Sequence, residues 1–203
     1  MYLEVGQYNE SKCHNSIKYV ALSREANMRT SKNPLALQSQ NWVFSSFTKL
    51  LRSFPYDDIS VMMICKDAGI DRRTFYRYFD NKRDVLRSYM DSIFNEYLDR
   101  LNENPIPEAT EYLKLFFSFW NDQHMAFLSS LHRNGLLNTT FTENKRYSLQ
   151  INALIARQLG RNSNEYEVAY RAGGLINVLS AWIAAGCVES PDEMVSILSK
   201  IFI

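Results

Sequence analysis

Residues 59–86 read ISVMMICKDAGIDRRTFYRYFDNKRDVL, and the rest of the chain can be interpreted outward from this stretch. Apolar residues at helical spacing predict a short helix that Ser60 caps and that ends before Gly69. Gly69 occupies the position after a helix where left-handed backbone is favoured. Asp71 is placed to cap a second helix. Two short helices joined by such a tight turn predict a helix-turn-helix.

The second helix of this pair carries cations at the end where helix physics favours anions. Arg72 and Arg73 lie in its first turn, which has partial positive charge. The spacing places Phe75 and Phe79 on one side, and the polar side is formed by Arg72, Arg73, Tyr76 and Arg77. A nucleic-acid backbone would supply the missing negative charge, and arginine pairs with guanine O6 and N7 or with phosphate. The alternative is a solvated basic face.

Further helices are predicted on both sides of the motif. Upstream, a helix that Pro55 ends carries one apolar stripe, made of Val43, Phe47, Leu50, Leu51 and Phe54. Downstream, Asn81 can cap a long helix with Asp84 at its third position. Lys82 opens that helix, where an ammonium and free N–H groups together form an anion site. The helix continues almost to the proline-containing linker at 102–107.

The remainder of the chain is helical in pattern. Helical periodicity recurs over 108–120, 122–134, 142–160, 164–187 and 191–202, and no long period-two alternation indicates a sheet. The prediction is an all-α protein with a three-helix helix-turn-helix domain over 35–86. A long helix joins this domain to a second helical domain over 87–203. Residues 1–34 are polar and are expected to be a flexible extension.

Composition narrows the class of protein. Residues 29–88 contain eleven basic and six acidic side chains, whereas residues 89–203 contain nine basic and thirteen acidic ones. A basic block joined to an acidic block indicates a polyanionic partner for the first only. The three cysteines are widely spaced, and no apolar run is long enough for a membrane span. A cytoplasmic protein without metal, cofactor or catalytic constellation is expected, and hence no enzyme.

The motif resembles the DNA-binding domain of TetR/AcrR-family transcriptional regulators over residues 35–86. The matching positions are Ala68, Gly69, Ile70, Thr74, Phe75, Tyr76, Phe79 and Lys82. The sequence departs from the family pattern in having Asp71 where Ser or Thr is common and Arg73 where a small residue is common. The DNA-contacting set that we expect is Ser60, Arg72, Arg73, Thr74, Tyr76, Arg77 and Lys82. Whether Arg73 contacts a base or a phosphate stays open.

The resemblance implies that the second domain binds a ligand and mediates dimerisation. Residues 172–198 resemble the last two helices of one TetR subgroup. The expected dimer interface is formed by Leu175, Leu179, Trp182, Ile183, Met194, Ile197 and Ile201, with an intramolecular core as the alternative. The aromatic-rich stretch 113–132 suggests a small-molecule pocket that includes Phe116, Phe119, Trp120 and Phe127, although such a stripe is also typical of plain core.

Taken together, the residues and the resemblance predict a homodimeric, sequence-specific transcriptional regulator. It is expected to bind a pseudo-palindromic operator in double-stranded DNA and to act as a repressor that a small-molecule effector releases. The second hypothesis is a TetR-fold coactivator or adaptor that works through protein–protein contacts without binding DNA.

Overall fold

The computed structural model describes residues 34–104, 106–143, 145–158, 160 and 164–201. The extension expected over residues 1–34 lies outside the described residues except for Pro34. Within the described ranges the regular structure is helical and contains no strand, which confirms the all-α prediction. No described helix is long and apolar enough to cross a membrane.

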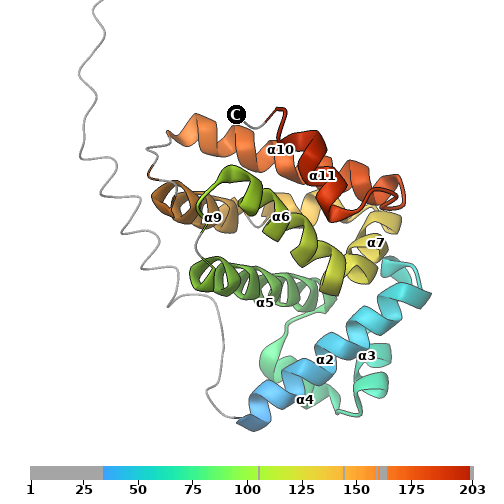
Figure 1. Cartoon of the computed structure of the whole chain (residues 1–203). Helices are drawn as coiled ribbons and strands as arrows, with labels where there is room; N and C mark the ends of the chain where they lie inside the picture. The colour runs from blue at the N-terminus through green and yellow to red at the C-terminus, as the bar shows by residue number, and fades with distance from the viewer. Residues whose placement is uncertain (1–33, 105, 144, 159, 161–163, 202–203) are drawn as a thin grey trace, which may run out of the picture.

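The described helices follow one another along the chain as shown in Figure 1. They are α2 (Pro34–Ser53), the short 3₁₀ segment η1 (Tyr56–Asp58), α3 (Val61–Ala68), α4 (Arg72–Tyr78), α5 (Lys82–Glu103), α6 (Ala109–Phe119), the π turn η2 (Trp120–His124), α7 (Met125–Arg133), α8 (Leu137–Glu143), α9 (Lys145–Gln158), α10 (Glu165–Ala184) and α11 (Pro191–Leu198). Helices α2 to α4 gather at one end, and α6 to α11 pack around the far part of α5.

The first domain forms around the apolar stripe of α2. Four of its five predicted members are buried: Val43, Phe47, Leu50 and Leu51. Phe54 is 44% exposed, because α2 ends at Ser53 and the chain turns away before Pro55. The buried stripe packs against α3 and α4. The prediction is therefore correct for the helix and wrong for its last apolar residue.

Helix α5 belongs to both domains. It begins beside α4 and extends along the second domain, where its inward side buries Ile93, Phe94, Tyr97 and Leu101. Hence the boundary that we placed between residues 86 and 87 falls inside a continuous helix.

The second domain differs from the prediction in two places. A break was expected near residue 121, but the helical path continues there through the π turn, whose residues Trp120 and His124 are both buried. The short helix α8 was not predicted, because its sequence LNTTFTE has too few apolar residues to show a period. Near the C-terminus, Ser190 and Glu193 form a capping box with Pro191 at the first helical position of α11.

The two domains are joined at Tyr56. The backbone N–H of Tyr56 donates to Oδ1 of Asn134, just after α7, at 2.7 Å. Nη2 of Arg133 donates to the backbone oxygen of Arg52 at 3.3 Å, next to the end of α2. The ring of Tyr89 on α5 packs edge-on against Phe127 of α7, with 4.8 Å between centroids. Through these contacts α7 holds the end of α2 and the 3₁₀ segment in place.

Candidate nucleic-acid interface

Side-chain and backbone caps fix the turn between α3 and α4. Ser60 accepts a hydrogen bond from the backbone N–H of Met63, and Gly69 adopts a left-handed conformation with φ of 66°. Asp71 accepts from the backbone N–H of Thr74 at 2.7 Å. That hydrogen bond is the main cause of a lowered pKa of the Asp71 carboxyl. All three residues therefore have the local roles that the sequence predicted.

The inner side of α4 anchors it to the first domain. Phe75 is fully buried and Phe79 is nearly so. Their ring centroids lie 5.6 Å apart, and Phe44 of α2 lies 5.6 Å from Phe79. Because these rings fix the rotation of α4 about its axis, its opposite side is held outward. The predicted separation of the two faces is confirmed.

Arg72 and Tyr76 form a pair on the outer side of α4. Nη2 of Arg72 donates to the Tyr76 hydroxyl at 3.3 Å, and the guanidinium carbon lies 5.7 Å from the ring centroid. The residues are one helical turn apart, so the contact is local. It restricts the Arg72 side chain before any ligand arrives.

Arg73 and Arg77 have different surroundings. Both are exposed, and the Arg73 guanidinium makes no hydrogen bond or ion pair with another described residue. The guanidinium of Arg77 stacks over Tyr78, with 4.8 Å between its carbon and the ring centroid. Together with Thr74 and Tyr76 these two arginines line an open depression on the surface of α4. Helix α4 contains no acidic residue, so the depression is lined by cations and hydroxyls.

Lys82 faces the protein, which differs from the phosphate contact that we predicted. Its ammonium donates to the backbone oxygens of Tyr56 at 2.6 Å and Asp57 at 3.0 Å. The same nitrogen lies 4.4 Å from the centroid of the Tyr56 ring. An ammonium has three donors, and two of them are used here. Sequence spacing cannot reveal this contact, since the carbonyls lie more than twenty residues upstream.

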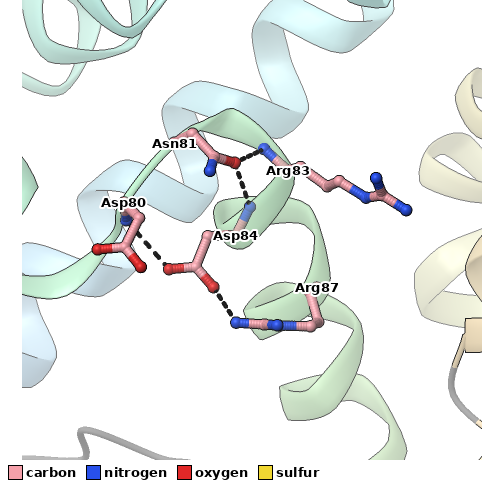
Figure 2. A network of polar contacts seen from close by, with 5 residues as sticks. All are labelled: Asp80, Asn81, Arg83, Asp84 and Arg87. Carbon is pink, nitrogen blue, oxygen red and sulfur yellow. Dashed lines mark hydrogen bonds and ion pairs between the residues drawn. The ribbon is translucent and has the colours of Figure 1, made fainter.

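A polar network holds the start of α5 next to α4 (Figure 2). Oδ1 of Asn81 accepts from the backbone N–H groups of Arg83 and Asp84, as its predicted capping role requires. The Asp84 carboxylate accepts from the backbone N–H of Asp80 at 3.1 Å and pairs with Arg87. The side chain of Arg83 points away from this network in Figure 2 and pairs with Glu143 of α8. The position of α4 is thus fixed at both of its ends.

The residues predicted for a ligand pocket are all buried but do not gather at one site. Phe116 and Trp120 line a cavity in the second domain, whereas Phe119 and Phe127 are packed elsewhere in the core. Tyr97 and Tyr112 also line the cavity and were missed. They come from regular apolar positions of α5 and α6, so their spacing could not distinguish them from core residues.

Most residues predicted for a dimer interface pack inside one chain. Buried members are Leu175, Leu179, Trp182, Ile183 and Met194, whereas Ile197 and Ile201 are 47% and 69% exposed. The apolar side of α10 is turned toward α7, α8 and α9, which explains the burial. No group of described histidine, cysteine and acidic side chains is arranged to hold a metal ion.

Comparison with known proteins finds a family match over the helix-turn-helix and the residues that flank it. Residues 48–89 match the family described as bacterial regulatory proteins, tetR family. The chain is similar to the HTH-type transcriptional regulator EthR of Mycobacterium tuberculosis, with 41% identity over 66 residues, 31% of each chain. It is also similar to the dhaKLM operon transcriptional activator DhaS of Lactococcus lactis, with 33% identity over 66 residues, 32% of this chain and 34% of the relative. The match thus spans about a third of the length of these relatives.

Solved structures resemble a larger part of the chain. The fatty acid degradation regulator FadR of Bacillus halodurans superposes with a TM-score of 0.62 at 20% identity, over 85% of this chain and 96% of the other. A TetR-family regulator of Syntrophomonas wolfei gives a TM-score of 0.61 at 15% identity, over 80% and 92%. At these identities the likeness concerns the fold alone. Residues 48–89 therefore match the tetR family, and the chain as a whole shares the helical fold of these solved structures.

Proposed function

We propose that the protein is a DNA-binding transcriptional regulator that places α4 in the major groove. The observation that carries the proposal is the division of α4 into two sides. Phe75 and Phe79 hold one side in the first domain, and the exposed cations Arg73 and Arg77 occupy the other. The groove of B-DNA accepts a helix of this size, and its phosphates supply the negative charge that α4 lacks.

The contacts of the arginines suggest different roles on DNA. Arg73 is free to direct its guanidinium at a guanine edge, which requires two parallel donors. Arg72 is already hydrogen-bonded to the Tyr76 hydroxyl, and the pair offers donors to a phosphate oxygen. The Ser60 hydroxyl keeps its O–H donor for the DNA backbone, since in its capping contact it accepts a hydrogen bond. The Thr74 hydroxyl is hydrogen-bonded to Asp71. On this proposal Arg73 specifies sequence, and Arg72 and Tyr76 fix position.

A second copy of the chain completes the proposed regulator. Two recognition helices on a dimer bind half-sites about 34–36 Å apart, which corresponds to a pseudo-palindromic operator. Support comes from the apolar side chains that α10, α11 and their flanks leave exposed within one chain: Tyr166, Tyr170, Val188, Ile197 and Ile201. Burial of such side chains between copies is the usual source of stability in a homodimer.

The proposed output is repression that a small-molecule effector relieves. The effector would bind the second domain and shift the protein toward a state whose α4 helices no longer fit successive grooves. One relative, DhaS, is named an activator, so the sign of the effect needs a direct test. Transcription from a bound promoter, measured with and without the purified protein, distinguishes repression from activation.

DNA binding itself is tested by fluorescence anisotropy with genomic fragments over a range of salt concentrations. We expect affinity to fall linearly with the logarithm of salt concentration. The change Arg73→Ala should weaken binding to the selected operator by about 1–3 kcal/mol and relax its sequence preference. Arg157→Ala is the matched control, because it removes the same charge from an exposed position on α9. Binding that is absent at low salt would favour the adaptor hypothesis.

A further inference from the structure

The π turn places a buried histidine beside an ion pair of α5. His124 is 6% exposed, and its Nε2 lies 3.7 Å from Oε2 of Glu96. Nη2 of Arg100 donates to the other carboxylate oxygen of Glu96 at 3.1 Å. The Phe119 ring covers the group, with its centroid 4.7 Å from that of the His124 ring and 5.1 Å from the guanidinium carbon of Arg100. One carboxylate is therefore shared between a permanent cation and an imidazole that gains its charge only at lower pH.

Burial in the π turn leaves two nitrogen atoms without a hydrogen bond. Within the described part of the chain, neither Nε2 of His124 nor Nε1 of Trp120 has a hydrogen-bond partner. The separation of His124 and Glu96 is too long for one. Buried polar atoms of this kind are uncommon and destabilising. The conformation of the turn is therefore held by the packing of its rings and not by hydrogen bonds at these two atoms.

The charges that act on His124 come from α5. Burial is the main cause of its lowered pKa, Glu96 counteracts that shift, and Arg100 adds to it. The other acidic, basic and histidine side chains of the π turn and of α6 and α7 are all exposed: Glu111, Lys114, Asp122, His132 and Arg133. A proton on His124 would thus depend on Glu96 for compensation, and Arg100 already pairs with that carboxylate.

We infer that the π turn is an acid-responsive element, in which protonation of His124 moves its side chain out of the core and releases the hold of α7 on the first domain. An imidazolium inside the core would lose its hydration next to a cation, whereas outside the core it regains water. The open form takes up its proton near the ordinary histidine value of about 6.5 and the closed form only at lower pH, so acid favours the open form. The inference rests on the proposed function, because it adds a regulation of DNA binding by pH.

Helix α7 is the part that carries the change to the first domain. It begins directly after His124 and is nine residues long. Its far end carries Arg133 and is followed by Asn134, which hold the backbone of Arg52 and Tyr56. Because a helix this short moves as one body, a displacement at its start shifts these contacts. The recognition helix would then lose the orientation that the second domain gives to it.

Tryptophan fluorescence of the purified full chain without DNA tests the opening of the turn. Trp120 belongs to the turn, and its ring centroid lies 5.8 Å from that of His124. We expect the emission maximum to move to longer wavelength between pH 8 and 5, because Trp120 meets water, while circular dichroism in the far ultraviolet shows that the helices remain. His124→Gln should abolish this shift. Trp42→Phe, which removes an indole that is 47% exposed on α2, should keep it.

The two charged neighbours give a second test that does not depend on the stability of the His124 variant. Arg100→Gln removes the cation beside the imidazole, so the fluorescence change should need a lower pH. Glu96→Gln removes the anion, so the change should begin at a higher pH. Shifts that are absent or in the same direction for both variants, a change that survives in His124→Gln, or no change in the native chain would overturn the inference.

DNA binding connects the turn to function. In fluorescence anisotropy with genomic fragments at constant ionic strength, the native chain should bind at least about fivefold more weakly at pH 5 than at pH 8, since about 1.5 pH units below 6.5 allow up to about thirtyfold. His124→Gln should lose less than about twofold, whereas His132→Gln, at an exposed position of α7, should behave like the native chain. An affinity of the native chain that does not fall with pH would contradict the inference. A native chain that fails to bind at pH 8 contradicts the proposed function instead, and the fluorescence then decides the acid response by itself.

Discussion

The contacts that stabilise each domain internally differ in how far apart their residues lie in the sequence. In the helix-turn-helix, each cap joins residues two or three positions apart, as with Asp71 and Thr74. In the second domain, decisive contacts cross the chain: Nε2 of Gln158 donates to the backbone oxygen of Leu101 at 2.8 Å. Local contacts are visible in a sequence because spacing encodes them. Contacts between distant segments are visible only in the folded molecule.

The largest effect is expected from removing the anchor of α4. Phe75→Ala deletes a fully buried ring and should lower the free energy of unfolding by about 3–5 kcal/mol, with loss of DNA binding. Phe54→Ala is the control, since that ring is 44% exposed and its removal should change stability by less than about 0.5 kcal/mol. Chemical denaturation measures both. Similar losses for the two variants would show that burial of single rings does not hold the first domain together.

The alanine variants of Lys82 and Arg73 should differ from each other, with intermediate effects on stability and on DNA binding. Lys82→Ala removes hydrogen bonds to two backbone oxygens and should lower stability by about 1–3 kcal/mol while leaving the salt dependence of DNA binding unchanged. Arg73→Ala should reduce that salt slope by about one unit if it meets a phosphate, and should change sequence preference if it meets a base. Chemical denaturation of both variants measures their stability, and salt titrations of their DNA binding measure the salt slope. A flatter salt slope for Lys82→Ala with full stability would restore Lys82 as a phosphate contact.

The smallest effect concerns pH, and it should differ between the domains. Burial is the main cause of a lowered pKa of His124, which faces Glu96 at 3.7 Å with Arg100 nearby. Unfolding therefore takes up a proton, so the second domain loses stability as pH falls below the ordinary histidine value of about 6.5. The lowered pKa of Asp71 has the corresponding effect in the first domain only at about pH 4 and below.

Chemical denaturation at pH 8, 6 and 5 measures the loss of stability that we expect from His124. The native chain should lose stability between pH 7 and 5, and His124→Gln should remove part of that loss. His132→Gln is the matched control, because His132 is exposed near the end of α7. An unchanged pH profile for His124→Gln would assign the loss to other groups.

The sequence predicted most of the first domain for a physical reason. Ser60, Gly69, Asp71 and Asn81 each act on backbone groups within a few residues, so their types and spacing were sufficient. Lys82 was interpreted differently because its partners are brought to it by the fold. The same limit explains why the assigned DNA contacts remain predictions, since an exposed side chain gains its role only from a ligand.

In the second domain the sequence predicted helices but not their rotation. An apolar stripe on α10 was assigned to a dimer interface with an intramolecular core as the alternative, and Leu179 and Trp182 pack within the chain. Periodicity shows that one side of a helix is apolar and does not show which neighbour covers it. The sequence predicted two residues of the cavity wall, Phe116 and Trp120, and missed the others, because the cavity forms where side chains from five helices and the π turn fail to fill the space.

The π turn has a consequence for comparing this chain with others of different length. Such a turn contains one residue more than an α-helix needs over the same path. Deleting a single residue between Trp120 and His124 would remove the bulge and let α6 and α7 run on as one regular helix over the same path. The residues of α7 would keep their direction, so Asn134 would still face Tyr56. A one-residue gap at this place in an alignment would therefore mark the loss of the bulge and leave the junction of the two domains in place.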